Sequence, residues 1–372
     1  MKKNLLSDVQ EKLLMGPGPS CVHPSVYEAL SRPTIGHLDP DFIAIMDEIK
    51  TMLRRVLKTE NNLTIPISGT GSAGMETCFV NLIEQGDAVL ILTNGVFGKR
   101  MEDVAGRLGA NVDAIEFAWG TPVVPEDVKK KLDARTYKIV AIVHAETSTG
   151  VLNPVAEVGT LLKGSESLYL VDSVTSLGGM DVSADEWGAD VLYSGTQKCL
   201  SCPPGLSPVT FSDRAVEMLR KRKSKVPNWY LDLTLLTQYW DGAARVYHHT
   251  APINMLYGLY QALYLILEEG PENVYARHKE NHEKLISGLE ELGLKMLVET
   301  SCRLPMLNSV CIPEGVNDAD VRKRLLNEYR IEIGAGLGEL AGKIWRIGLM
   351  GHTARPENVN RLLSMLSEII RR

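Results

Sequence analysis

The sequence predicts an α/β protein with a large domain on a mostly parallel, seven-stranded sheet and a small α+β domain at the C-terminus. The chain has 372 residues, more than a typical single domain, so we expect a second one. Between residues 63 and 211, short β-rich runs alternate with helix-compatible or turn-rich stretches, as in crossover units. Past Tyr247 this alternation stops and long helical patterns begin. The second unit therefore follows the alternating region.

The strands predicted for the large domain are short and apolar along almost their whole length. Strands of this kind are typical of a sheet that is covered on both faces, and such sheets are mostly parallel. The first strand precedes a glycine-rich loop and a helix that we expect from Met75 to Ile83. The seven runs are Leu63 to Ile67, Ala88 to Leu92, Val112 to Phe117, Tyr137 to Val143, Leu168 to Asp172, Asp190 to Tyr193 and Pro208 to Phe211.

The C-terminal part is predicted as two long helices and then a small sheet with helices. The second long helix ends at Gly293, a common stop signal. Gly334 to Gly338 does not have dinucleotide-binding spacing, so we expect a flexible active-site loop there. We divide the chain into an arm (1–20), a large domain (21–255) and a small domain (256–372). The expected helices are Leu256 to Glu269, Asn273 to Leu292, Asp318 to Tyr329 and Glu357 to Arg371, and the expected strands are Asn308 to Ile312, Ile331 to Ile333 and Lys343 to Leu349.

Composition excludes several functional classes. Asp and Glu number 46 against 40 Lys and Arg, so the formal charge of −6 gives no general attraction for nucleic acid. No apolar run approaches the ~20 residues that a bilayer requires, which predicts no membrane partner. The chain's start becomes polar before a signal core could form, and six scattered cysteines do not suggest a disulfide framework. We therefore expect a cytoplasmic protein with reduced thiols.

The loop from Ser68 to Gly74 is the first candidate for a binding site. It is rich in glycine and small residues, it follows a predicted strand, and it precedes a predicted helix. Free amide groups at a helix N-terminus attract a phosphate. The loop matches neither nucleotide-binding pattern, and a simple turn is the alternative interpretation.

Asp172 and Lys198 are the second and third candidates, and each follows a buried strand. In open α/β sheets, ligands lie beyond the carboxyl ends of the strands, so a carboxylate there would face the ligand. The lysine amine has an unperturbed pKa of about 10.4, which burial lowers, and a neutral amine can form a Schiff base with an aldehyde. The alternatives are an aspartate that caps the next turn and a solvated surface lysine.

A phosphate-binding loop, a strand-end aspartate and a strand-end lysine together indicate a pyridoxal 5'-phosphate site, because each serves a different part of that cofactor. The sequence also resembles the class V, fold-type I aminotransferases of the alanine:glyoxylate and serine:pyruvate group over nearly its whole length. The motifs that carry the resemblance, with the loop above, are Gly16-Pro17-Gly18-Pro19-Ser20, Glu146-Thr147-Ser148-Thr149-Gly150, Val171-Asp172-Ser173-Val174, Ser194-Gly195-Thr196-Gln197-Lys198, Tyr247-His248-His249-Thr250 and Arg346-Ile347-Gly348.

The resemblance implies roles for individual residues. Lys198 would hold the cofactor as an imine, and Asp172 would contact its pyridinium nitrogen. Phe97 stands where tryptophan is common and would stack on the ring with less area. The other implied cofactor contacts are Thr70, Gly71 and Ser72 at the phosphate, Thr147 and Gln197 at the ring oxygen or phosphate, Val174 on a ring face, and Tyr247 and Thr250 from the neighbouring subunit of a homodimer.

The resemblance also implies that Gly18 and Arg346 bind the substrate. Strand alternation places Arg346 on the face opposite Trp345 and Ile347, and its planar guanidinium suits a carboxylate. From spacing alone, a surface salt bridge would be the favoured interpretation at this position, and the resemblance reverses that preference. In the family, this arginine holds the substrate's α-carboxylate.

We therefore expect a pyridoxal-phosphate-dependent aminotransferase that moves an amino group from alanine or serine to glyoxylate or pyruvate. Ureidoglycine:glyoxylate transfer is an alternative within the family. A fold-related lyase or desulfurase is another, and it would need a thiol such as Cys302 or Cys311. We expect no metal at His248 and His249, because adjacent residues of a strand point to opposite faces.

Overall fold

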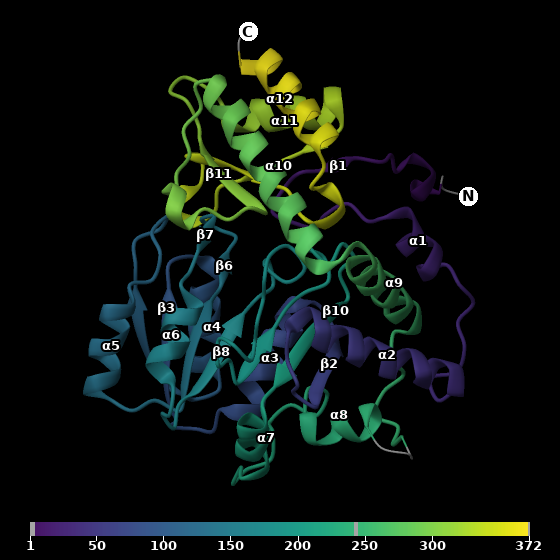
Figure 1. The fold of residues 1–372 in the computed structure, drawn as a ribbon, viewed down its shortest axis with the longest axis vertical. Helices are drawn as coiled ribbons and strands as arrows, with labels where there is room; N and C mark the ends of the chain where they lie inside the picture. The colour runs from purple at the N-terminus through teal and green to yellow at the C-terminus, as the bar shows by residue number, and fades with distance from the viewer. Residues whose placement is uncertain (1–3, 242–244, 371–372) are drawn as a thin grey trace.

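The computed structural model describes residues 4–241 and 245–370 of the chain. It has two parts (Figure 1): a large α/β body, and a smaller body built by the C-terminal helices and a short sheet. The N-terminal segment runs along the smaller body before it enters the larger one at α1 (Pro24–Leu30). The α/β class and the division between a large and a small sheet match the sequence-based expectation.

The large sheet has seven strands in the order β2-β10-β9-β8-β5-β3-β4. Only β10 is antiparallel to its neighbours, β2 and β9, and the other pairs are parallel. Each strand begins and ends within two residues of its predicted run. The strands are β2 (Leu63–Ser68), β3 (Ala88–Thr93), β4 (Asn111–Glu116), β5 (Ile139–Val143), β8 (Leu168–Asp172), β9 (Val191–Tyr193) and β10 (Leu206–Phe211).

Helices cover this sheet, and most begin at a residue that favours a helix start. Proline occupies the first turn of α1, α2 and α5, where its missing N–H costs no hydrogen bond. Ser212 accepts a bond from Ala215 N at 3.2 Å and so caps α7. The helices after α1 are α2 (Pro40–Leu57), α3 (Gly71–Leu82), α4 (Val96–Arg107), α5 (Pro125–Ala134), α6 (Val155–Leu162), α7 (Asp213–Arg220), α8 (Leu233–Trp240) and α9 (Ile253–Glu269).

The smaller body packs three helices on an antiparallel sheet of order β11-β14-β13. Residues 334–335, expected in a flexible loop, instead form β13, because their backbone pairs with β14. Arg371, the predicted end of the last helix, lies outside the described residues. The elements are α10 (Pro271–Glu291), β11 (Leu307–Cys311), α11 (Asp318–Tyr329), β12 (Ile331–Glu332), β13 (Gly334–Ala335), β14 (Ile344–Gly348) and α12 (Pro356–Ile370).

Short elements connect these parts. The hairpin of β6 and β7 follows β5, and the 3-10 helix η4 follows β14. The short elements are η1 (Leu5–Asp8), β1 (Leu13–Leu14), β6 (Ala145–Glu146), β7 (Val151–Leu152), η2 (Thr300–Cys302), η3 (Gly338–Leu340) and η4 (Gly351–Thr353). Among the helices of the described ranges, none is long and apolar enough to cross a bilayer.

The N-terminal arm is held by the smaller body. Strand β1 pairs in parallel with β12, and Met15 is buried in the same core cluster as Trp345. Gly348 N donates to Met15 O at 2.8 Å, so the arm runs directly beside β14. A side chain at Gly348 would collide with the backbone of Gly16. The arm therefore enters the large body from a fixed position on the smaller one.

The predicted division at residues 20, 255 and 256 stays a prediction, and we propose a later second boundary. Helix α9 packs on α1 and α2, and its buried residues belong to the large core cluster. Apart from Met15 of the arm, the buried residues of the smaller cluster begin within α10, at Leu285. Apart from the arm, a boundary inside α10 would keep each of the two largest core clusters within one unit.

Candidate active site

A cavity of about 120 Å³ lies where the carboxyl ends of β8 and β9 meet the N-termini of α3 and α4. This is the position at which parallel α/β sheets bind ligands. The cavity brings together eight of the predicted site residues: Thr70, Gly71, Ser72, Phe97, Asp172, Val174, Gln197 and Lys198. Met75, Arg100 and Tyr193 also line it and had no predicted role.

Lys198 follows β9 and is only 7% exposed. Burial lowers the pKa of its amine to about 8, and the nearby positive charge of Arg346 adds to this effect. The amine donates a hydrogen bond to the carbonyl of Pro17 in the arm. The lysine is therefore covered by the arm, and a large share of its amine is neutral near pH 8.

Gly18 of the arm lies directly against this lysine. Its backbone has a φ of +104°, and a Cβ added there would lie 2.7 Å from Lys198 Cδ. Both the left-handed conformation and the close approach require glycine. The structure thus places Gly18, one of the two predicted substrate residues, at Lys198.

Asp172 ends β8 and is buried. Its Oδ1 accepts a bond from Val174 N at 2.8 Å, and its Oδ2 accepts one from the Tyr193 hydroxyl at 2.6 Å. Burial raises the pKa of Asp172 to about 6, and the two hydrogen bonds oppose this rise. A positive group in the cavity would therefore be stabilised by the ionised carboxylate.

Tyr193 is a site residue that the sequence analysis missed. It pairs in register with Asp172 across the parallel strands β8 and β9. Its hydroxyl reaches Asp172 because neighbouring strands place register partners on the same face. The apolar run predicted strand β9 but not its register with β8. The contact between Tyr193 and Asp172 could therefore not be inferred from the sequence.

The loop after β2 has the geometry of an anion site. Thr70 is the N-cap of α3, and its side chain makes no capping bond to the helix. The first amide groups of a helix have no partner within it and point at any anion placed there. Gln197 Oε1 is buried in the same cavity without a hydrogen-bond partner among the described residues. A ligand in this cavity therefore has an open site for an anionic group and an unused buried oxygen.

Glu146, a second residue without a predicted role, joins the start of α4, which contains the cavity residue Phe97, to the segment after β6. One carboxylate oxygen accepts bonds from Ser148 N at 3.0 Å and Ser148 Oγ at 2.6 Å. The other accepts from Phe97 N at 3.1 Å and Gly98 N at 3.4 Å, at the start of α4. Burial raises the pKa of Glu146, although these bonds lower it. Glu146 thus holds Phe97 beside the segment that contains Thr147.

Arg346 on β14 contacts the same segment. Its Nε donates to Ala335 O at 2.7 Å, and one Nη1 hydrogen goes to Thr147 O at 3.2 Å. Of the residues described, none bonds to its Nη2 group. Burial lowers the pKa of Arg346 to about 10, so it stays charged at neutral pH. The guanidinium is oriented by two carbonyls and keeps donors for a carboxylate, and the surface salt bridge considered above is not observed.

Tyr247 and Thr250 are not brought into this cavity within one chain. Both side chains are exposed, and their hydroxyls lie 3.5 Å apart. The intervening His249 contacts Ser68 Oγ, at the start of the candidate anion-binding loop, at 2.7 Å. In the described part of the chain, no group of three or more His, Cys, Asp or Glu is arranged to hold a metal ion.

The cysteines near the lysine are buried thiols. Burial raises the pKa of both Cys199 and Cys202 to about 12. Burial also raises the pKa of Cys302 and of Cys311, the thiols considered for a lyase or desulfurase. None of these four residues lines the cavity that contains Lys198. A thiolate nucleophile is therefore not available beside the lysine.

A family model described as Aminotransferase class-V matches residues 24–360. The chain belongs to the class V aminotransferase family. Its fold is accordingly the fold-type I architecture, its activity is transamination, and its cofactor is pyridoxal phosphate.

Known members of the family align with the whole chain. The crystal structure of an alanine–glyoxylate aminotransferase from Nostoc is 50% identical with a TM-score of 0.95, and each chain covers 100% of the other. That of a ureidoglycine–glyoxylate aminotransferase from Bacillus subtilis is 40% identical with a TM-score of 0.96, over 98% of this chain and 94% of that one. An alanine–glyoxylate aminotransferase of Drosophila melanogaster is 42% identical over 97% of this chain and 93% of its own.

The residues of this aminotransferase fit pyridoxal phosphate. The unpartnered Gln197 Oε1 and the uncapped start of α3 offer bonds to polar groups of the cofactor. The carboxylate of Asp172 suits a protonated pyridine nitrogen, and the Lys198 amine suits an aldehyde. These are the three functions that the sequence assigned to three separate segments.

We expect Glu146→Gln to lower the free energy of unfolding of the cofactor-free enzyme by about 2 to 4 kcal/mol. A carboxylate accepts all four surrounding hydrogen bonds, whereas an amide opposes some of these donors with its own NH₂ group. Urea unfolding measures the change. Glu116→Gln is the control, because Glu116 is 65% exposed and pairs only with a surface lysine. Equal effects of the two substitutions would contradict this role.

Proposed function

We propose that this aminotransferase transfers the amino group of a small amino acid, alanine or serine, to glyoxylate or pyruvate. The observation that carries the proposal is the convergence of Lys198, Asp172 and an open anion-binding loop on one cavity. Arg346 lies close enough to that cavity for its charge to lower the pKa of Lys198. The names of the Nostoc and Drosophila relatives support alanine and glyoxylate.

Each residue has a part in this reaction. Pyridoxal phosphate supplies the electron sink when it is bound. Lys198 would hold the cofactor through its aldehyde, and once its amine is free it would accept the Cα proton of the substrate and later give that proton back. An amine whose pKa is near 8 serves both steps, because it is neither permanently charged nor too weak a base. Asp172 would keep a proton on the pyridine nitrogen.

The remaining predicted residues would seat the cofactor. Thr70, Gly71 and Ser72 would bind the phosphate at the start of α3. Phe97 and Val174 would pack on the two faces of the ring, and both line the cavity. Thr147 and Gln197 would bond to the ring oxygen or the phosphate.

We propose that Arg346 and Gly18 bind the substrate. A carboxylate on Arg346 would replace solvent at the buried guanidinium and orient the Cα–H bond toward Lys198. Gly18 leaves room for the reacting carbon beside the lysine, because any side chain there would meet the lysine.

Ureidoglycine transfer to glyoxylate is the second candidate, since a Bacillus subtilis relative with that name is 39% identical over 97% of this chain. A panel of alanine, serine and ureidoglycine against glyoxylate, pyruvate and 2-oxoglutarate separates the two. Transfer from ureidoglycine at a higher kcat/KM than from alanine would favour the second candidate.

We further propose a cytoplasmic homodimer with shared active sites. Tyr247 is 56% exposed and Thr250 is exposed too, although the family resemblance gives both a cofactor contact. Trp229 in the neighbouring segment is 63% exposed and stacks on His248, which extends the aromatic surface. A second subunit that covers this surface would bring its own Tyr247 and Thr250 toward the phosphate of its neighbour.

The Lys198 assignment predicts where, and at which pH, the protein captures the cofactor. Borohydride should fix pyridoxal phosphate onto Lys198, as peptide mapping would show. Capture by the cofactor-free protein should speed up as the pH rises from 7 to 9, because the neutral amine is the nucleophile and its pKa is about 8. The reaction of Nα-acetyl-lysine, which has a free side-chain amine, with the cofactor is the control. It shows how the rate changes with pH because of the cofactor's own titrating groups. A label on another lysine would refute the assignment.

The clamp assignment predicts that Arg346→Ala keeps its cofactor but loses activity on amino acids. Loss of a buried, charge-assisted pair costs about 2 to 5 kcal/mol, so kcat/KM for alanine should fall by roughly 30-fold to several thousand-fold. Arg346→Lys should recover only part of this loss, because lysine lacks the planar fork. Steady-state kinetics and the visible spectrum of the holoenzyme decide the matter. Near-normal kcat/KM, or loss of the cofactor, would contradict the clamp.

Shared active sites predict recovery of activity in mixed dimers. Lys198→Ala subunits and Tyr247→Ala/Thr250→Ala subunits are each expected to be nearly inactive alone. A mixed dimer contains one site in which both sets of residues are intact, so partial activity should return on mixing. Differently tagged subunits allow the mixed species to be purified and assayed. Failure to recover activity in purified mixed dimers would argue against contributions across the interface.

A further inference from the structure

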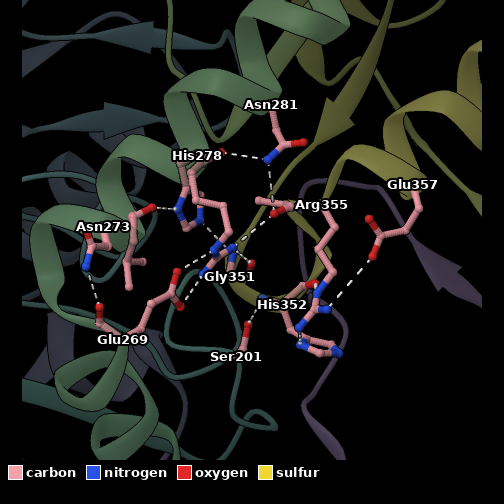
Figure 2. Close-up of polar contacts among 12 residues, drawn as sticks. Ser201, Glu269, Asn273, His278, Asn281, Gly351, His352, Arg355 and Glu357 are labelled. Atoms are coloured by element: carbon pink, nitrogen blue, oxygen red, sulfur yellow. Dashed lines mark hydrogen bonds and ion pairs between the residues drawn. The ribbon is translucent and has the colours of Figure 1, made fainter.

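The 3-10 helix η4 (Gly351–Thr353) follows β14, which contains Arg346, and is joined by hydrogen bonds to α10, to the turn after Lys198 and to Cys21, just after the arm. Figure 2 shows the hydrogen bonds that η4 forms with His278 of α10 and with Ser201. A cavity of about 490 Å³ borders η4 and is distinct from the one that contains Lys198. The hydrogen bonds of η4 have no assigned part in the reaction.

Two adjacent residues of α10 hold η4 on one side. Arg277 Nη1 donates to Gly351 O at 2.9 Å and to Ala354 O at 3.0 Å, and the rest of its guanidinium pairs with Glu269 at 2.7 and 2.9 Å. His278 accepts a bond from Gly351 N at 2.9 Å through Nε2 and donates to Val274 O at 2.7 Å through Nδ1 (Figure 2). The polar groups of Arg277 and His278 that face η4 thus all form hydrogen bonds, and these bonds fix η4 on α10.

Ser201 holds η4 on the other side. Its Oγ accepts a bond from His352 N at 2.7 Å. Gly351 is so close to this turn that an added Cβ would lie 2.6 Å from Cys199 O. The amide of His352 is therefore directed at Ser201 and not at solvent. Ser201 is itself buried, at 8% exposure.

The same serine is bonded to the backbone of Lys198. Ser201 N donates to Lys198 O at 3.0 Å, and that carbonyl also accepts a bond from Ser20 Oγ at 2.7 Å. The arm residue Ser20 lies 3.4 Å from Ser201, oxygen to oxygen. Ser201 therefore links three elements: the turn after Lys198, the arm, and the segment that continues from Arg346.

We propose that Ser201 is a positioning residue for the reaction, whose bond to His352 N fixes the Arg346 strand relative to Lys198. The inference deepens the proposed function and depends on it, because it takes Arg346 as the carboxylate clamp and Lys198 as the proton carrier. A substrate held at both places needs them at a constant separation, since small misplacement of reacting groups slows a reaction strongly. The bond from η4 to Ser201 provides this constraint outside the cavity.

The backbone of Ser201 provides a way to separate its hydroxyl from its conformation. Its φ is +50°, a left-handed value that glycine adopts freely and alanine does not. Ser201→Gly removes the hydroxyl and keeps the turn favourable, whereas Ser201→Ala removes the hydroxyl and leaves the backbone strained. The two variants therefore differ in stability and share the loss of the bond to His352.

We expect both variants to lose about 10-fold in kcat/KM for alanine, mostly through kcat, whatever their thermal stability. The visible spectrum of the holoenzyme, and its change with pH, should stay as in the wild type. Conversion of the holoenzyme by isopropylamine, in which a methyl group replaces the carboxylate of alanine, should change less than about twofold because the clamp is not used. Ser167→Gly and Ser167→Ala are the controls, since Ser167 is also buried, at 4% exposure, but lies before β8, at the end of the strand opposite to Asp172.

A merely structural role would give a different pattern. Ser201→Gly would then keep the wild-type kcat/KM while Ser201→Ala lost activity with stability, or alanine and isopropylamine would be affected equally. Either result overturns the inference. In an Arg346→Ala background, Ser201→Gly should add less than about a twofold loss, because it acts through the arginine. An additive tenfold loss there would also overturn it.

The comparison with Arg346→Ala separates this inference from the proposed function. If Arg346→Ala itself leaves kcat/KM for alanine unchanged, the clamp assignment fails, and the inference fails with it. If Arg346→Ala is strongly impaired but both Ser201 variants behave as the wild type, only the positioning role is wrong.

Discussion

The burial of the Lys198 amine is the physical constraint on which the active site depends. A charged amine without full hydration is costly, so enclosure lowers its pKa to about 8 and makes the neutral form accessible. The enclosure is made by the arm, which places the Pro17 carbonyl on the amine and Gly18 against its side chain. The arm in turn is held by the smaller body through β12 and Gly348. The reactivity of one lysine thus requires both bodies of the protein.

A second set of buried groups defines the cavity around that lysine. Asp172 and Glu146 are both enclosed carboxylates, and burial raises the pKa of each. They differ in the number of hydrogen bonds that oppose this rise in pKa. Glu146 accepts four hydrogen bonds from the protein, whereas Asp172 accepts two. The protein itself supplies the hydrogen bonds that the Glu146 carboxylate needs, so this residue is suited to a structural role. Asp172 retains capacity for a cationic partner, which is what a pyridinium nitrogen provides.

The sequence predicted the fold well because apolar runs and strand ends are local signals. The seven strands, the long helices and the strand-end positions of Asp172 and Lys198 were all visible in the pattern. Contacts that depend on register or on packing between distant segments were not, which is why Tyr193, Glu146 and Ser201 had no predicted roles. Residues 334–335 were expected in a loop because their glycine content hides a strand that exists only by pairing with β14. The individual roles of the predicted site residues stay predictions, as does the cross-subunit position of Tyr247 and Thr250.

The path of the arm has a consequence for how the protein matures. Leu13 N donates to Arg330 O at 2.8 Å, so residues near the two ends of the chain must meet before the arm can dock. The segment that supplies Pro17 and Gly18 to Lys198 is made before the large sheet during synthesis, and its partners β12 and β14 are made after that sheet. Contacts of such long sequence separation form late in folding. The large sheet can therefore form while its lysine is still open to water, and the closed pocket exists only once β12 and β14 have been made and have bound the arm.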